Sequence, residues 1–137
     1  MDDQDDQWQG DPDLAAALQE SVGNYLNATS IEFDFVANNT SGISFEYLFL
    51  SEEYRPTNCT YSDGFAFLIK KAGSTDPYTN IALVPGTQDP VTSLSINTAP
   101  NCPRNTGYFG SFNGTNSPTA FDGQTKVLTA KKDNIIP

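Results

Sequence analysis

Three acidic side chains lie in one short polar segment between two strongly apolar runs. Glu52 and Glu53 follow the first run and Asp63 precedes the second, so both ends of the segment 51–64 carry carboxylates. Carboxylate and carbonyl oxygens are the ligands that calcium prefers, and calcium commonly stiffens loops of extracellular β-domains. If the two runs pair as a hairpin, the three side chains converge. The sequence therefore predicts a calcium site at Glu52, Glu53 and Asp63, and calcium is the one cofactor that it suggests.

A purely structural role for these carboxylates is the alternative interpretation. Neighbouring residues such as Glu52 and Glu53 point to opposite sides of an extended segment. The chain also has no Asp-x-Asp-x-Asp-Gly calcium loop. On this interpretation one glutamate contacts the backbone or Arg55, and Asp63 caps the turn before Gly64.

Catalysis by the same side chains is not expected. A glycosidase holds two carboxylates about 5–10 Å apart across a sugar-binding cleft, and nothing in the spacing predicts such a cleft. The chain has no histidine, which excludes Ser-His-Asp and Cys-His mechanisms within it. We therefore predict that the protein is not an enzyme and assign no catalytic residues.

The two cysteines, Cys59 and Cys102, favour a disulfide. Each lies in a polar, turn-like stretch, and a zinc site is unsupported because the spacing is wrong and histidine is absent. A bridge closing a loop of this size would stabilise the fold by about 3–4 kcal/mol. Because disulfides persist in oxidising compartments, the pair indicates an extracellular or cell-surface protein.

Two further sets of residues bear on surface function. Asn-x-Ser/Thr acceptors suggest N-glycosylation, although an Asn- and Thr-rich chain also carries such triplets by chance. Exposed aromatic side chains would suit a glycan or a protein ligand, although aromatic residues more often fill a core. The predicted acceptors are Asn27, Asn38, Asn39, Asn58 and Asn113, and the predicted ligand-binding residues are Tyr54, Tyr61, Tyr108 and Phe109.

Most of the chain has the pattern of short strands separated by turns. Apolar and polar side chains alternate from Ile43 to Leu50 and from Phe65 to Lys70, and also in the stretch Ile31–Val36. Near the start, Asp11 and Pro12 form a helix-initiation signal, followed by an apolar stripe that extends to Tyr25. We predict an all-β, antiparallel, jelly-roll-like sandwich with one short N-terminal helix.

The charge of the chain limits its partners. At 137 residues and a net charge of −10, it offers no cluster of Lys and Arg for nucleic-acid phosphates. No stretch approaches the length of a transmembrane segment. An acidic chain of this kind suits a solvated extracellular surface.

Several motifs occur together in one order that resembles the choice-of-anchor L domain of secreted and surface-attached bacterial proteins. The densest part is Phe45 to Tyr54 (FEYLFLSEEY), followed by Ser62 to Ile69 (SDGFAFLI). The remaining blocks are GDPDL at 10–14, IEFDFV at 31–36, IALVPG at 81–86, SINT at 95–98, FDG at 121–123 and TKVLTA at 125–130. The resemblance covers about residues 10–137 and implies a β-rich extracellular module without a defined reaction.

The resemblance also shapes the expected organisation and function. It predicts an acidic leader at 1–10 and a single sandwich domain at 11–137 that lacks a family N-terminal segment and a last C-terminal β-segment. We expect a non-catalytic cell-surface module for adhesion or for binding an extracellular glycan or protein. The alternative is a structural subunit that self-assembles with its neighbours into a filament or surface layer, because a missing strand would leave an open sheet edge.

Overall fold

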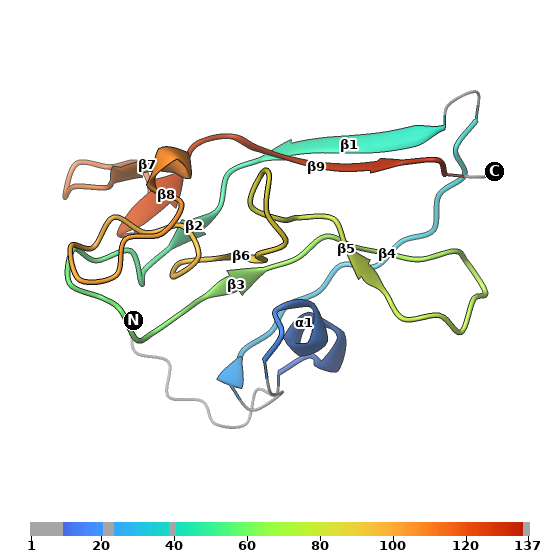
Figure 1. The fold of residues 1–137 in the computed structure, drawn as a ribbon, viewed down its shortest axis with the longest axis horizontal. Coiled ribbons are helices and arrows are strands. Elements are labelled where there is room, and N and C mark those ends of the chain that lie inside the picture. Colours follow the sequence, from blue (N-terminus) through green and yellow to red (C-terminus); the bar gives the residue numbers. More distant parts are fainter. Residues whose placement is uncertain (1–9, 21–23, 39–40, 136–137) are drawn as a thin grey trace.

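The computed structural model describes residues 10–20, 24–38 and 41–135 and shows two β-layers with a helix beneath (Figure 1). Almost all of its regular structure is antiparallel strand, so the predicted all-β, sandwich-like class is confirmed. The predicted acidic leader falls on residues 1–9, outside the described residues, apart from Gly10.

The first layer is built on a long antiparallel ribbon. Strand β1 (Gly42–Tyr47) pairs with β9 (Leu128–Asp133) along its whole length. Three shorter strands continue the layer in the order β2-β8-β7, and β7 follows a short 3-10 helix, η2. Their bounds are Leu50–Ser51 for β2, Gly123–Thr125 for β8, Phe109–Phe112 for β7 and Thr106–Tyr108 for η2.

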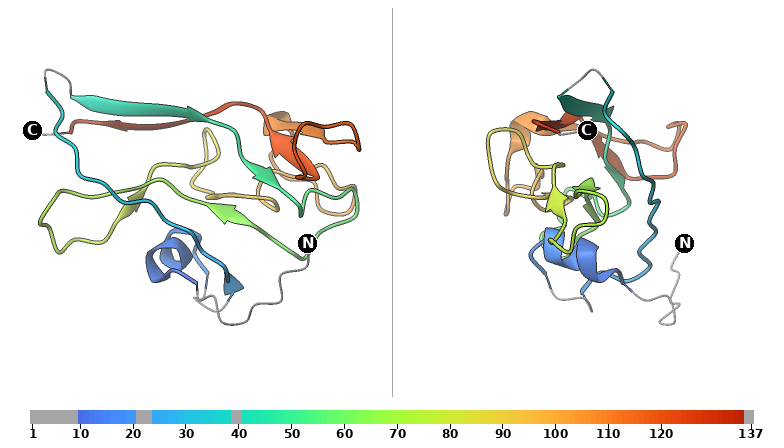
Figure 2. Two further views of the ribbon diagram at one scale, coloured as in Figure 1. Left: turned by 180° about the vertical axis from the view of Figure 1, so that it is seen from behind. Right: turned by 90° about the vertical axis from the view of Figure 1, so that its right-hand side faces the viewer.

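The second layer consists of two short strand pairs that lie below the first layer (Figure 1). Strand β3 (Gly64–Phe65) pairs with β6 (Val91–Thr92), and β4 (Leu68–Ile69) pairs with β5 (Thr79–Asn80). The end-on view in Figure 2 shows both layers with the helix on the outer side of the second.

Aromatic rings fill the space between the layers. Phe45 of β1 stacks on Phe67 at 5.0 Å between ring centroids, and Tyr47 lies 5.1 Å from Phe65. Burying one such side chain stabilises a fold by about 1.5–3 kcal/mol, so these contacts are the principal link between the layers. The buried cluster comprises Phe49, Tyr54, Val84, Val91, Ile96, Phe109 and Leu128.

Helix α1 (Pro12–Ala17) begins as the sequence predicts and ends sooner. The Asp11 side chain accepts a hydrogen bond of 2.9 Å from the Leu14 N–H, which confirms the N-cap. The helix stops at Leu18, after which Gln19 has a left-handed backbone with φ of 60°. Leu18 packs against Gly64 of β3, so the helix covers the second layer.

The strand predicted at Ile31–Val36 was wrong. This stretch forms no strand, and within the described chain its backbone makes no hydrogen bond. The condition on which the three acidic side chains would converge is not met either, because the two central runs form no hairpin: β1 pairs with β9 whereas β3 pairs with β6. Alternation identified extended segments, but pairing depends on partners that lie far away in the sequence.

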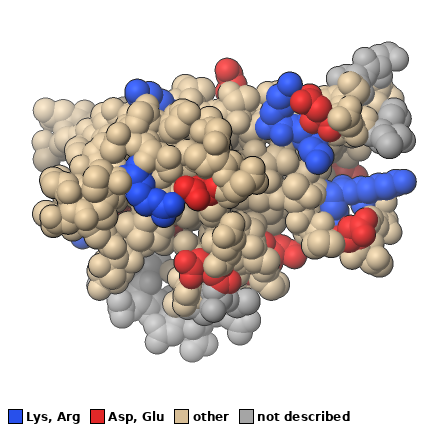
Figure 3. All heavy atoms as spheres, viewed as in Figure 1, with Lys and Arg blue, Asp and Glu red and all other residues tan. Residues whose placement is uncertain are grey.

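Charged groups are dispersed over the surface. The face drawn in Figure 3 carries positive and negative side chains side by side in small clusters, without a field of one sign. Among the described residues the ion pairs are exposed, and they are Arg55–Asp122, Arg104–Asp89 and Lys131–Asp133. Among the described residues, no helix has the length and apolar character needed to cross a bilayer.

Candidate functional site

The segment Ser51–Gly64, here called loop 51–64, is closed at its base by buried polar contacts. The Ser51 hydroxyl donates a 2.5 Å hydrogen bond to the Asp63 carboxylate and accepts one of 2.9 Å from the Glu53 N–H. Ser93, beside β6, donates its N–H to the Asp63 carbonyl and accepts from the Asp63 N–H. Both serine residues are fully buried. The two ends of the loop are therefore fixed to each other and to the second layer.

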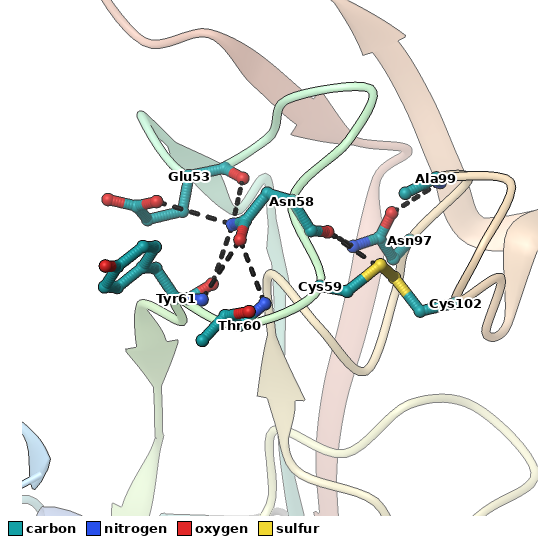
Figure 4. The surroundings of a disulfide bond; sticks show 8 residues. All are labelled: Glu53, Asn58, Cys59, Thr60, Tyr61, Asn97, Ala99 and Cys102. Carbon is teal, nitrogen blue, oxygen red and sulfur yellow. Dashed lines mark hydrogen bonds between the residues drawn. A yellow bond between two sulfur atoms is a disulfide. The ribbon is translucent and has the colours of Figure 1, made fainter.

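Asn58 organises the middle of the loop (Figure 4). Its side-chain nitrogen donates to the carbonyls of Glu53 and Tyr61, both at 2.8 Å. Its side-chain oxygen accepts from the N–H groups of Thr60 and Tyr61, both at 3.0 Å. One side chain thus satisfies backbone groups on both arms of the loop, in place of a strand partner.

A disulfide ties the tip of the loop to a distant turn. Cys59 and Cys102, 43 residues apart, are joined across a Cα–Cα distance of 5.9 Å, which confirms the predicted bridge. Asn97 reinforces the contact, since its side chain donates to the Asn58 carbonyl at 3.2 Å (Figure 4). The loop is therefore held at its base, middle and tip.

The three predicted calcium ligands belong to this loop but do not assemble as a metal site. No group of three metal-binding side chains that could hold an ion occurs among the residues that the structure describes. The Asp63 carboxylate already accepts from Ser51. Burial raises the pKa of Glu53, and the negative charge of Asp63 raises that pKa further. Arg55 forms its ion pair with Asp122 at 3.0 Å. The three acidic side chains of the loop therefore do not converge on one point where an ion could be bound.

Of the four predicted ligand-binding aromatics, the structure exposes one. Tyr61 is 70% exposed, whereas Tyr54 and Phe109 belong to the buried cluster and cannot meet a ligand. Tyr108 packs against that cluster and donates its hydroxyl to the Pro85 carbonyl at 3.2 Å. The prediction was wrong for Tyr54 and Phe109 because their rings are needed between the layers, where they lie 5.3 Å apart.

The predicted glycosylation sites differ in accessibility. Asn27 and Asn38 are exposed, and Asn39 lies outside the described residues. Asn113 is half-buried and donates its side-chain nitrogen to the Phe121 carbonyl. Asn58 uses the nitrogen to which a glycan would be attached in the hydrogen bonds described above. Glycosylation remains a prediction at all five positions, and among the four described acceptors Asn27 and Asn38 are the exposed ones.

Two shallow clefts that the sequence did not predict adjoin the end of loop 51–64. One, of about 350 Å³, includes Ser62 together with Tyr25, Asp89 and Arg104. The other, of about 300 Å³, includes Asp63 and is lined in part by Leu14, Leu26, Phe49 and Phe121. The consecutive loop residues Ser62 and Asp63 thus contribute one to each cleft, directly after Tyr61 in the sequence. The clefts combine segments far apart in the sequence, so no local signal could have revealed them.

These features define a disulfide-linked, β-rich surface module with one rigid loop beside two shallow clefts. The family model of the Choice-of-anchor L domain matches residues 1–137, the whole chain, and the chain belongs to this family. That membership confirms the resemblance and indicates a secreted or surface-associated protein. Neither a curated protein nor a solved structure matches the chain significantly.

Proposed function

We propose that this protein is a non-catalytic extracellular surface module for adhesion, which binds a glycan or protein ligand through loop 51–64. The observation that carries the proposal is the exposed ring of Tyr61 on a loop held rigid by Asn58 and by the Cys59–Cys102 bridge. Tyrosine offers a broad apolar surface and a polar hydroxyl at low entropic cost. A rigid loop also loses little conformational freedom on binding, and this favours affinity.

The two clefts also support a ligand-binding site at loop 51–64. Ser62 and Asp63, which follow Tyr61, line one cleft each. A ligand bound at this end of loop 51–64 would have polar groups of the first cleft, including Arg104 and Asp89, and apolar groups of the second, including Leu26, in the same region. This mixture suits an extended glycan or peptide better than a small buried substrate.

The absence of catalysis is part of the proposal. The chain has no histidine, and two of the three carboxylates of the loop accept hydrogen bonds within it, Asp63 from Ser51 and Glu53 from Asn58. General acid–base chemistry needs such groups free to reach a substrate.

Calcium is a separable part of the proposal. An ion bound by Glu52, Glu53 and Asp63 would relieve the repulsion that contributes to the raised pKa of Glu53. Calcium at millimolar concentration should then raise the melting temperature, and a chelator should reverse the rise. The double substitution Glu53→Gln with Asp63→Asn should abolish it. A melting temperature that does not respond to calcium would refute calcium binding but would leave the ligand-binding proposal unaffected.

Binding is tested by screening the intact chain on a panel of glycans and extracellular-matrix proteins, followed by affinity measurements on any hit. Tyr61→Ala should weaken binding about tenfold or more, since hot-spot truncations cost at least ~1–2 kcal/mol. Phe112→Ala is the matched control, because Phe112 is an exposed aromatic residue that lies outside loop 51–64. Equal affinity for both variants would refute the assignment to this loop.

A structural subunit is the second candidate function, and one observation favours it. The ribbon of β1 and β9 is a two-stranded sheet, so within the described residues β9 has no strand partner on its outer edge. Open edges readily accept another strand. Self-association that persists in chelator and in the Tyr61→Ala variant would support this function over ligand binding.

A further inference from the structure

The segment Ile31–Val36, here called segment 31–36, is an elongated stretch of chain without a strand partner among the described residues. It runs from the region of α1 to the start of β1 (Figure 1). Ile31 is 89% exposed and Phe33 is 66% exposed, and the rings of Phe33 and Phe35 contact each other at 6.4 Å. Its only side-chain anchor among the described residues is the bond from the Tyr78 hydroxyl to Glu32. Six residues thus present their backbone groups and large apolar side chains to solvent.

This state is unfavourable for an alternating apolar sequence. Unpaired N–H and C=O groups keep their hydrogen-bonding capacity, and a contiguous exposed apolar patch marks an interaction surface. Ile31, Phe33 and Phe35 alternate with Glu32 and Asp34, which is the pattern of a strand with one buried face. The segment lacks only a sheet edge to pair with.

A suitable edge lies elsewhere on the same molecule. Strand β9 pairs with β1 on one side, and none of the described residues pairs with its other side. Along β9 the residues Leu128 and Ala130 face the core, whereas Thr129 and Lys131 face solvent. Lys131 and Lys132 give this edge positive charge in an otherwise acidic chain. The edge is therefore complementary to the two acidic residues of segment 31–36.

We propose that segment 31–36 of one copy adds as an antiparallel strand to the free edge of β9 in a second copy. The register that pairs Glu32 with Lys131 also matches both faces, because it places the apolar side chains of the segment on the same side as the inward-facing residues of β9. In that register Ile31 lies opposite Lys132, Glu32 opposite Lys131, Phe33 opposite Ala130, Asp34 opposite Thr129, Phe35 opposite Leu128 and Val36 opposite Val127. The apolar row then extends the interior of the partner, and Glu32 meets a lysine.

Existing contacts of the paired charges do not oppose this register. Lys131 lies 3.1 Å from Asp133 in an ion pair that is more than half exposed on both sides, and such pairs contribute little. Val127, opposite Val36, is itself exposed. Pairing would therefore bury exposed apolar surface without breaking a buried interaction.

The geometry determines the kind of assembly. The donated segment and the accepting edge are different parts of the chain, so the contact is heterologous and each copy can both give and receive a strand. Repetition produces an open chain of subunits unless it closes into a ring. The inference rests on the second candidate function, the structural subunit, and specifies its contact.

The first experiment measures association of the intact chain by sedimentation velocity from micromolar to millimolar concentration. We expect concentration-dependent oligomers. Phe33→Asp should raise the dissociation constant at least tenfold, because it places a charge in the apolar row. Phe121→Asp is the matched control, since Phe121 is also exposed but lies outside both surfaces, and it should leave the constant unchanged. A chain that stays monomeric throughout would overturn both the inference and the structural-subunit function.

The second experiment tests the register by charge reversal. Glu32→Lys and Lys131→Glu should each weaken self-association several-fold, since cross-strand charge pairs have measurable effects of either sign. An equimolar mixture of the two variants should associate as the unchanged chain does, because the segment of the first variant complements the edge of the second.

The outcomes separate the inference from the function on which it rests. Association that is unaffected by Phe33→Asp would refute this contact but keep the structural subunit. Weakening by both charge reversals without recovery in the mixture would refute the register. Association that is lost in Phe33→Asp and recovered in the mixture would support the contact in full.

Discussion

Loop 51–64 is held by more contacts than its polar sequence suggests, and segment 31–36 is held by fewer than its strand-like sequence suggests. The loop is rich in polar residues and has almost no regular structure, yet Asn58, Ser51 and the disulfide fix it on all sides. The segment has the alternation of a core strand, yet it makes no backbone hydrogen bond among the described residues. Order therefore follows the number of satisfied partners in the fold, and local β-propensity alone does not determine it.

The contrast is sharpest for two phenylalanines. Phe49 is 7% exposed and belongs to the buried cluster, whereas Phe33 is 66% exposed. Phe49→Ala should destabilise the protein by about 3–5 kcal/mol because it leaves a cavity. Phe33→Ala should change stability by less than about 0.5 kcal/mol. Denaturant unfolding at low protein concentration measures both, and a large cost at Phe33 would mean that the segment packs within its own chain.

Removing the disulfide should be the next largest effect. Reduction, or the variant Cys102→Ser, frees the tip of loop 51–64 and is expected to cost about 3–4 kcal/mol in the loop-entropy model. Unfolding with and without reductant provides the measurement. The double variant Cys59→Ser with Cys102→Ser should be insensitive to reductant. A wild-type chain of equal stability in both conditions would contradict the bridge.

Asn58→Ala should weaken the loop from within. The substitution leaves several backbone groups without their side-chain partner, at a cost of about 2 kcal/mol since individual hydrogen bonds contribute about 0.5–1.5 kcal/mol. Asn38→Ala is the matched control, because Asn38 is exposed. Equal melting temperatures for the two variants would show that the backbone holds the loop without Asn58.

Tyr54→Phe should have a smaller effect of the opposite sign. The Tyr54 hydroxyl is buried without a hydrogen-bond partner among the described groups, and burial raises the pKa of this side chain. Removing an unsatisfied hydroxyl should stabilise the fold by up to about 1 kcal/mol. Tyr61→Phe, at an exposed position, should be neutral. A clear loss of stability in Tyr54→Phe would indicate that the hydroxyl has a partner in solution.

The smallest effect concerns pH. Burial, followed by Asp63, raises the pKa of Glu53 above its usual value of 4.5, so the folded state binds a proton more tightly than the unfolded state. The resulting stability is present below the unfolded pKa and is lost as pH rises through the folded pKa. Glu53→Gln should therefore stabilise the protein slightly at pH 7, by less than about 0.5 kcal/mol because the site is largely solvated. At pH 3 the difference should vanish, whereas a constant difference would point to a cause other than charge.

The sequence predicted the features that depend on few residues. Asp11 and Pro12 form a local capping signal, and the helix begins there. With only two cysteines in the chain, one pairing was possible, and it occurs. Alternation also placed the aromatic rings of β1 correctly toward the second layer.

The features that depend on distant partners could not be predicted. Ser51 lies in β2 and Ser93 beside β6, and both meet Asp63 only in the folded chain. The triplet that predicts glycosylation at Asn58 is a local signal, whereas the hydrogen bonds of its side chain depend on the path of the whole loop. The burial of Tyr54 also depends on a distant residue. A Cβ at Gly123 would lie 2.6 Å from the Tyr54 Cβ, so Tyr54 fits only because residue 123 is glycine. No local pattern around Tyr54 shows this.

The pairing of β1 with β9 has a consequence for how the protein acquires its fold. Gly42 lies opposite Asp133, so the ribbon forms only after most of the chain has been brought back upon itself. Closing such a large loop is entropically costly, and folds dominated by distant pairings take about milliseconds to seconds to form. A secreted chain that emerges from its amino end would expose β1 long before β9 follows it. The first layer of the fold can therefore be completed only when nearly the whole chain is available.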